Sequence, residues 1–164
     1  MLATEPLSIR AYDASDDAFI AAVAREAFDE FTPRAVPHTL DIVRHNTTLI
    51  ALRDVPERDR PANDGAPRRV RAGFAAVSVE GRGTLVLNAI AVVRSERGRG
   101  IGHRLLLAVE RLAQQRGVER VELCTADCNL AALDLFFRHG FSIVRRRERF
   151  YERGQAACIL VKLL

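Results

Sequence analysis

A glycine-rich turn between an apolar segment and an amphipathic segment constrains the fold of this chain more than any other feature. Residues 85–93 are apolar apart from Asn88, which is typical of a central strand covered on both faces. Apolar residues recur at helical spacing over residues 101–112. The turn between them is made mostly of glycines and arginines: Arg97, Gly98, Arg99, Gly100 and Gly102. Glycines let backbone N–H groups approach a ligand, and a helix presents its positive end there, so the sequence predicts a phosphate-binding site.

Three known phosphate-binding loops compete to explain this turn. A P-loop requires a lysine at its end, but Lys162 is the only lysine of the chain. A dinucleotide-binding loop requires G-x-G-x-x-G, and its third glycine would fall on His103. The third pattern, R-x-x-G-x-G after a small apolar triplet, is matched by residues 97–102. An ordinary strand-to-helix connection is the remaining alternative for the loop taken alone.

Residues 90–102 resemble the acetyl-CoA loop of the GNAT superfamily of N-acyltransferases. A second block, residues 129–141, is similar to a later helix of that family, with an asparagine at its start and a Gly-Phe pair at its end. The two blocks stand at the family's usual separation, and with the strands around them they cover about half of the chain. The resemblance implies that acetyl-CoA is the co-substrate. It assigns cofactor binding to Ile90, Ala91, Val92, Arg97, Gly98, Arg99, Gly100, Ile101, Gly102 and Asn129.

Residues 1–164 are expected to form a single N-acetyltransferase domain of the α/β class. Alternation and apolar runs predict strands over residues 7–12, 48–53, 70–79, 85–93, 118–125, 141–148 and 156–164. Helical spacing and cap residues predict helices over residues 16–32, 39–45, 101–116 and 130–139. The last of these helices is expected to bury Leu130, Leu133 and Phe137. The segment 54–69 contains three prolines and is expected to be a mobile loop insertion.

The family resemblance also implies how these elements assemble. It implies a mixed central sheet of about seven strands that parts like a V, flanked by about four helices, with the pantetheine of CoA pairing with the open edge of one strand. In that mode of recognition the backbone groups of Ile90, Ala91 and Val92 matter more than their side chains.

Composition and charge fit a globular protein with a polyanionic ligand. The chain is 48% hydrophobic and 28% charged, and its net charge is +4. The longest apolar run is too short to span a bilayer, and the N-terminal residues lack the layout of a signal peptide. We therefore expect a cytoplasmic protein without a membrane partner, and a homodimer is compatible with the sequence.

Clustered arginines and three cysteines raise two further possibilities. Arg145–Arg147 and Arg149 invite a nucleic-acid hypothesis, but they lie on an expected strand, so a solvated strand face is favoured and no nucleic-acid partner is expected. Cys124, Cys128 and Cys158 have no metal-binding spacing. We expect them to be small buried side chains, and no metal site is predicted.

The resemblance implies a general acid and a general base, and this chain departs from the family's pattern at both. The usual tyrosine acid, four residues before the Gly-Phe pair, is replaced by Phe136, whose phenyl ring cannot donate a proton. Tyr151 is the candidate replacement, with packing as its alternative role. The positions of the usual glutamate base hold Asn88 and Cys124, and neither side chain is a good base. Asn88, alone in an apolar run, either orients substrate or ties down the local backbone.

Polar side chains on the first helix and the loop after it are expected near the acceptor. Glu26, Asp29, Glu30 and His38 could relay a proton or attract a cationic amine, and a solvated position is the alternative for each. Weak base chemistry favours an amine that loses its proton easily. At pH 7 deprotonation costs about 1.4 kcal/mol for an α-amine and about 4.6 kcal/mol for a lysine ε-amine.

These observations predict an N-acetyltransferase in which an amine attacks acetyl-CoA directly in a ternary complex. The expected acceptor is an α-amine or another low-pKa amine of a small molecule or peptide. Residues 145–151 and the closing strands look like the ribosomal-protein N-terminal-alanine acetyltransferase branch of the family. Three alternatives stay open: a CoA-binding or sensing module without turnover, an aminoacyl-tRNA-acetylating toxin, and an acetyltransferase for antibiotics or other small molecules.

Overall fold

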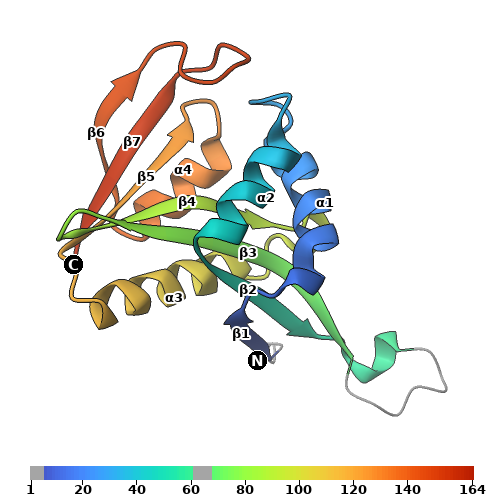
Figure 1. The fold of residues 1–164 in the computed structure, drawn as a ribbon. Coiled ribbons are helices and arrows are strands. Elements are labelled where there is room, and N and C mark those ends of the chain that lie inside the picture. The colour runs from blue at the N-terminus through green and yellow to red at the C-terminus, as the bar shows by residue number, and fades with distance from the viewer. Residues whose placement is uncertain (1–5, 61–67) are drawn as a thin grey trace.

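A seven-stranded mixed sheet forms the centre of the computed structural model, which describes residues 6–60 and 68–164 (Figure 1). Its strands are β1 (Leu7–Ala11), β2 (Thr47–Asp54), β3 (Arg69–Glu80), β4 (Thr84–Val92), β5 (Arg120–Ala126), β6 (Ser142–Arg147) and β7 (Ala157–Leu163). The spatial order is β1-β2-β3-β4-β5-β7-β6. Neighbouring strands are antiparallel except β4 and β5, which are parallel.

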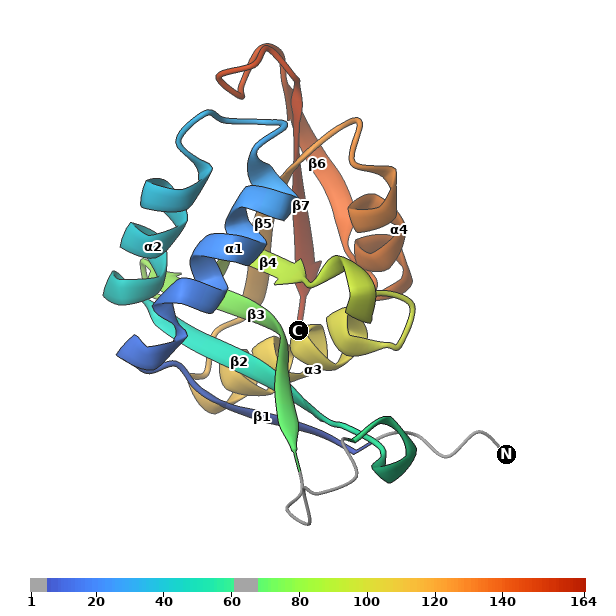
Figure 2. The ribbon, with the colours of Figure 1, turned by 90° about the vertical axis from the view of Figure 1, so that its right-hand side faces the viewer.

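Four α-helices cover the two faces of this sheet within the described ranges. They are α1 (Asp17–Phe28), α2 (Ala35–His45), α3 (Ile101–Gln115) and α4 (Leu130–Arg138). Figure 2 shows α1 and α2 on one side of the strands, and α3 and α4 on the other. The element order and the strand and helix numbers confirm the α/β fold that the sequence predicts.

Each helical layer encloses its own hydrophobic core. The larger core lies beneath α3 and α4 and includes Leu105, Val109 and Phe136. The smaller core lies beneath α1 and α2 and includes Ile20 and Phe74. Both helix pairs therefore bury one apolar face against the sheet, as amphipathic helices of a layered domain do.

A buried carboxylate fixes the start of α1. Asp16 is fully buried, and its carboxylate accepts hydrogen bonds from Arg10 Nη2 at 2.7 Å and Arg71 Nε at 2.6 Å. The hydrogen bond from Arg10 is the main cause that holds the pKa of Asp16 well below its usual value, so the carboxylate is ionised. This ionic cluster joins β1, β3 and α1 at one corner of the sheet.

The helices differ from the predicted ones in three places. The first helix ends at Phe28 rather than continuing toward Pro33, and α2 begins at Ala35 rather than at Thr39. Pro37 can stand in the first turn of α2 because the amide that it lacks would have no intrahelical partner there. The face predicted for the last helix is wrong at two of its three residues.

The buried face of α4 is rotated from the predicted one. Leu133 is buried as predicted, but Leu130 and Phe137 are 72% and 48% exposed, and Phe136 is buried in their place. Phe136 packs edge-on against Phe141, and both rings belong to the core beneath α3 and α4, which fixes this face of α4 toward the sheet.

The segment predicted to be a mobile insertion is described only in part. β2 extends to Asp54, a short 3-10 turn covers Glu57–Asp59, and β3 begins at Arg69, while residues 61–67 lie outside the described residues. Among the helices that the structure describes, none combines the length and apolar character needed to cross a membrane.

Candidate active site

The parallel strands β4 and β5 part halfway along their length. They pair only over Thr84–Leu87 and Arg120–Leu123. Both strands continue past this point, and the first residues beyond it are Asn88 on β4 and Cys124 on β5. The V-shaped splay implied by the family resemblance is therefore present. It leaves the edge of β4 that faces β5 without a strand partner.

Asn88 is the extra residue of a β-bulge in β4. The register with β3 pairs the residues on either side of Asn88 and gives Asn88 no opposite residue. The sequence predicts a buried side chain here, and this is wrong, because the bulge leaves Asn88 exposed. Its Nδ2 atom donates a hydrogen bond to Ser78 Oγ at 2.8 Å. The amide is therefore fixed in orientation at the branch point of the V.

A cavity of about 170 Å³ lies where the two strands part. Residues of α1, α2, β4, β5 and α4 line it, together with Tyr151 from the segment between β6 and β7. Its titratable lining side chains are His38, Cys124 and Tyr151, and none of the described carboxylates lines it. The cavity therefore offers little negative charge to a cationic amine.

Tyr151 brings a hydroxyl to the cavity from a distant part of the chain. Its Oη atom lies 3.8 Å from Cys124 Sγ, and its ring packs against Phe31 with 5.5 Å between centroids. Burial raises the pKa of the Tyr151 hydroxyl well above its usual value, and a phenol is protonated at neutral pH even without this shift. A neutral phenol in this position can donate a proton or a hydrogen bond.

The cysteines are more accessible than the sequence predicts. Cys158 is buried in the sheet as expected, but Cys124 and Cys128 are exposed. Cys124 opens into the cavity, where neighbouring atoms shield it, and this partial burial raises the pKa of its thiol. Cys124 is therefore not a ready base, in line with the sequence analysis.

Phe136 and Asn129 lie on the α4 side of the same cavity. Phe136 is buried, and both residues belong to the cavity wall. Asn129 Oδ1 accepts a hydrogen bond from the Ala132 amide at 3.3 Å, so Asn129 caps α4 as the sequence predicts. The position of the family's tyrosine acid thus faces the cavity with a phenyl ring instead of a hydroxyl.

The glycine-rich turn, residues 97–102, follows β4 in the chain, and we call it the phosphate loop after the ligand that the sequence predicts for it. Gly98 and Gly100 have φ angles of +77° and +76°, and a Cβ atom at either would meet nothing within 4 Å. Gly100 is the N-cap of α3, and its carbonyl accepts the first helical hydrogen bond from the Arg104 amide. The amides of the first helical turn therefore have no intrahelical partner and are free to bind an anion.

At Gly102 the absence of a side chain serves helix packing rather than a positive φ angle. A Cβ atom there would lie 3.1 Å from Leu135 Cδ2, so Gly102 lets α3 approach α4 closely. The sequence alone could not separate this packing role from ligand contact, because both require the absence of a side chain.

One ion pair and two hydrogen bonds fix the phosphate loop and the segment that precedes it. Arg53 on β2 forms a bidentate pair with Glu96, with 2.5 Å from Nε to Oε2 and 2.9 Å from Nη2 to Oε1. Arg97 Nε donates to the Val92 carbonyl at 3.1 Å. Glu26 accepts a hydrogen bond from the Arg94 amide at 2.9 Å. Glu26 is exposed and is not among the residues that line the cavity, so the solvated position, which the sequence analysis gave as its alternative, holds for this residue.

Two loops that are far apart in sequence join above the cavity, and we call their contacts the loop bridge. The Arg153 amide donates to the Phe31 carbonyl at 3.2 Å, and its Nε atom donates to the Asp29 carbonyl at 2.7 Å. Gln155 Nε2 donates to the Glu30 carbonyl at 2.8 Å. Figure 1 shows these two loops side by side above the strands. Asp29 and Glu30 contribute backbone carbonyls to the loop bridge, and the sequence analysis had no signal for this.

Comparison with known proteins agrees with this geometry. The family model described as the acetyltransferase (GNAT) family matches residues 11–141. No curated protein sequence matches the chain significantly.

Solved structures share the fold over nearly the whole chain. Ard1 from Thermoplasma volcanium is 19% identical, with a TM-score of 0.77 and coverage of 96% of this chain and 97% of that one. The ribosomal-protein-S18-alanine N-acetyltransferase from Escherichia coli is 19% identical, with a TM-score of 0.73 and coverage of 96% and 94%. Arabidopsis thaliana NAA60, solved with acetyl-CoA, is 20% identical, with a TM-score of 0.76 and coverage of 97% and 99%. With its splayed sheet, phosphate loop and matching family model, this chain belongs to the acetyltransferase (GNAT) family.

Proposed function

We propose that this protein transfers an acetyl group from acetyl-CoA to a primary amine, which attacks the thioester directly in a ternary complex. The parting of β4 and β5 is the observation that carries the proposal, because the edge of β4 that it frees runs from the cavity at Asn88 to Val92, and the phosphate loop follows in the chain. A thioester held along this gap would place its carbonyl near Asn88 and Cys124. Positioning of this kind can contribute up to about 7–11 kcal/mol to the barrier reduction.

The donor would bind through backbone groups. The pyrophosphate would fit against the amides of Gly98 to Gly102, where open space lies beside Gly98 and Gly100. The pantetheine would pair with the free edge of β4 at Ile90, Ala91 and Val92, since no strand occupies that edge beyond Leu87. Asn129 stands on the opposite wall of the gap. The neighbour NAA60, which was solved with acetyl-CoA, supports this choice of donor.

Tyr151 is our candidate for the group that protonates the departing thiolate. Its hydroxyl lines the cavity, lies 3.8 Å from Cys124 Sγ and, like any phenol of ordinary pKa, is protonated at neutral pH. Asn88 is our candidate for orienting the acceptor, because its amide is held by Ser78 at the branch point.

The acceptor we propose is an α-amine or another amine of low pKa. The observation behind this choice is the absence of a carboxylate among the described cavity-lining side chains. Without a strong base, the enzyme depends on the fraction of amine that is already neutral. For an α-amine this fraction is roughly a tenth at pH 7, and for a lysine ε-amine it is about four in ten thousand.

Initial rates on matched acceptors test this choice. We expect kcat/KM to be about a hundredfold higher for the α-amine of an alanyl peptide than for the ε-amine of an α-acetylated lysyl peptide. A preference for the ε-amine would contradict the proposal. Both rates are followed by release of free CoA thiol.

A CoA-binding module without turnover is the second candidate, favoured by the phenyl ring of Phe136 at the usual acid position. Calorimetric titration with CoA, combined with thiol release across an amine library, separates the two candidates. Binding with thiol release supports the transferase, while binding without any thiol release supports the module. The cytoplasmic location and the homodimer stay predictions.

A further inference from the structure

The helices α1 and α2 cover only part of one face of the sheet. They pack against β2, β3 and β4. The strands β5, β7 and β6 extend beyond them. In cross-strand register, Cys124 pairs with Ile159 and Ile159 pairs with Arg145, so these three residues share one face. Arg147 lies on the same face one pair further along, opposite Ala157.

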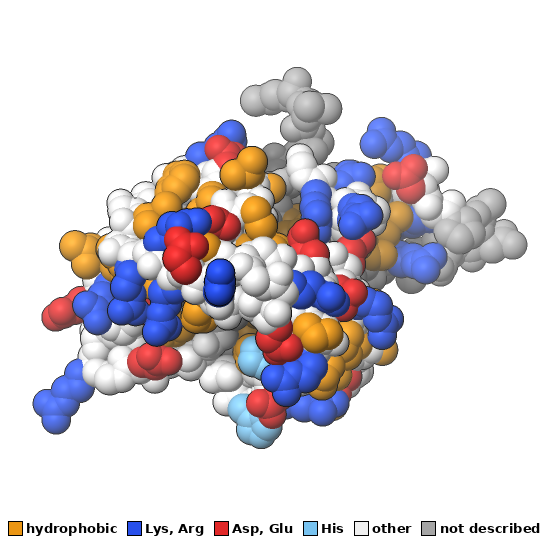
Figure 3. All heavy atoms as spheres, turned by 90° about the horizontal axis from the view of Figure 1, so that it is seen from above, with side chains coloured by type: hydrophobic (Ala, Val, Ile, Leu, Met, Phe, Trp, Pro, Cys, Tyr) orange, Lys and Arg blue, Asp and Glu red, His pale blue; other side chains and the backbone are white. Residues whose placement is uncertain are grey.

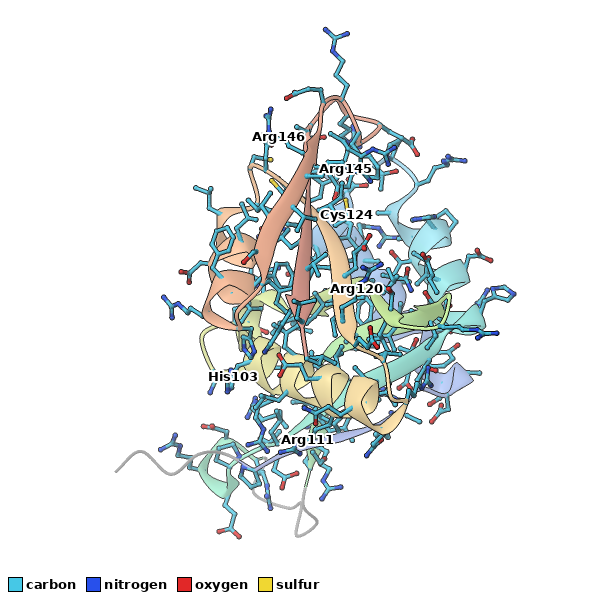
Figure 4. The ribbon with its side chains drawn as sticks, turned by 90° about the vertical axis from the view of Figure 1, so that its left-hand side faces the viewer. His103, Arg111, Arg120, Cys124, Arg145 and Arg146 are labelled. Carbon is cyan, nitrogen blue, oxygen red and sulfur yellow. The ribbon has the colours of Figure 1, made fainter. Side chains whose placement is uncertain are left out.

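The cavity opens onto this face. Cys124 both lines the cavity and is exposed to solvent, so the cavity reaches the surface beside it. The loop bridge joins the loops above the cavity through Arg153 and Gln155. An acceptor therefore has a side entrance between α2 and the open strand face. Figure 4 shows Arg145 and Cys124 on this side of the strands.

The arginines on this face carry charge that no ion pair among residues 6–60 and 68–164 neutralises. Arg146 points to the other face, toward α4, and pairs with Asp127 and Glu148 (Figure 4). By contrast, Arg145 and Arg147 are exposed and take part in none of the ion pairs that the described residues form. Glu122, the carboxylate on the same face of β5, pairs with neither of them. Seen from above, basic side chains are spread over the surface among acidic ones (Figure 3).

Arg147 also connects this charge to the cavity. Its guanidinium lies 5.6 Å from the centroid of the Phe150 ring, and that ring packs against Tyr151 with 5.1 Å between centroids. Its positive charge acts on the Cys124 thiol, where it opposes the rise in pKa that burial causes. A negative group placed between Arg145 and Arg147 would thus lie beside the entrance and close to the reacting atoms.

We propose that Arg145 and Arg147 bind a carboxylate of the acceptor, so that the preferred acceptor is an acidic peptide with a free α-amine. This inference rests on the proposed acetyl transfer. Two strand spacings of about 4.8 Å separate Arg145 from Cys124, which is about 10 Å, or three residues of extended chain. The acidic side chain is accordingly at the second or third residue of the peptide.

Three alanine tetrapeptide amides test the proposal, carrying glutamate, glutamine or lysine at the third residue. We expect kcat/KM to be about tenfold higher for the glutamate peptide than for the glutamine peptide, because a charge-assisted hydrogen bond is gained. The lysine peptide should be the poorest substrate. The advantage of glutamate should shrink as ionic strength rises, since the arginines are exposed to solvent.

Variants on one strand provide a matched control. The double change Arg145→Gln and Arg147→Gln should abolish the preference for glutamate while leaving the KM for acetyl-CoA unchanged. Arg146→Gln, on the opposite face, should retain the preference. The single change Arg145→Gln should reduce the preference in part and leaves the contact between Arg147 and Phe150 intact, and thermal unfolding checks the fold of each variant.

Three other outcomes would overturn the proposal, and each can be distinguished from the others. Equal rates for the glutamate and glutamine peptides would overturn the anion site and leave the proposed transfer standing. The absence of thiol release with every amine, in a protein that binds acetyl-CoA, would overturn the proposed transfer and this inference together. A tRNA gel shift that depends on Arg145 and Arg147, without any peptide preference, would assign the arginines to nucleic acid and overturn the proposal.

Discussion

The phosphate loop and the cavity lie toward opposite ends of the free edge of β4, but the chain builds them in different ways. The loop is one continuous segment, residues 97–102, whose backbone conformation comes from its own glycines. The cavity is assembled from α1, α2, both parted strands, α4 and Tyr151. Its closing contacts join residues more than a hundred positions apart, such as Asp29 and Arg153.

This contrast separates local from global determinants of the site. A loop that binds through backbone amides needs positive φ angles, which glycine adopts readily, so its chemistry can be recognised in the sequence. A cavity that binds through side chains depends on which distant residues the fold brings together. The loop should therefore respond to changes of backbone geometry, and the cavity to changes of single functional groups.

The largest expected effect is on the loop, from Gly100→Leu. Gly100 has a φ of +76°, and its surroundings are open space that the proposed phosphates would occupy. The added side chain would both strain the loop and fill this space. Because several charge-assisted hydrogen bonds would be lost, we expect CoA affinity to fall about a thousandfold, measured by titration calorimetry.

Gly81→Leu is the matched control for that change. Gly81 lies in the β3–β4 turn with a φ of +60°, and a Cβ atom there also meets nothing within 4 Å. Both substitutions should cost about 1–2 kcal/mol of stability through backbone strain. Only Gly100→Leu should lose CoA, and equal CoA affinity in the two variants would contradict the role of the loop.

The second-largest expected effect is a fall in kcat in the cavity variant Tyr151→Phe. The change removes the hydroxyl near Cys124 and keeps the ring contact with Phe31. General acid catalysis is commonly worth about 10²–10⁴-fold, and a thiolate leaves readily, so we expect kcat to fall about a hundredfold with CoA affinity unchanged. Steady-state kinetics and calorimetry measure the two quantities, and an unaltered kcat would show that Tyr151 only packs.

The smallest expected effect concerns the ion pair between Arg53 and Glu96, and it depends on pH. The side chains of Arg53 and Glu96 are each 12% exposed, and the hydrogen bond from Arg53 lowers the pKa of Glu96 below its ordinary 4.5. A lowered folded pKa means that the pair stabilises the protein above pH 4.5 and that this contribution is lost as the pH falls through the folded value.

Glu96→Gln should therefore lower the free energy of unfolding by about 1–2 kcal/mol at pH 7 and by less at pH 3. Urea unfolding at the two pH values measures the difference. CoA affinity should fall only about threefold, because binding must now order a less constrained loop. A stability loss that is equal at both pH values would contradict the ionic role of the pair.

More of the fold than of the candidate site could be predicted from the sequence. Its periodicities predict the seven strands and four helices in order, with most ends within a few residues, because hydrophobic pattern and turn residues are local. It also locates the turn at Gly98 and Gly100, where φ is positive, and the Asn129 cap, while phosphate binding by that turn stays a prediction. It is wrong on Asn88, which is exposed at a bulge, and of its two alternatives for Glu26 the solvated position holds.

By itself, then, the sequence determined the order of the elements, the backbone cradle of residues 97–102 and the phenyl ring of Phe136 at the usual acid position. Tertiary structure alone decided that Tyr151 reaches Cys124 and that, among the residues the structure describes, Arg146 forms ion pairs while Arg145 forms none. The physical reason is how far apart in the sequence the interacting residues lie. Backbone conformation follows from neighbouring residues, whereas the surroundings of a side chain are set by strands and loops that meet only when the sheet has formed.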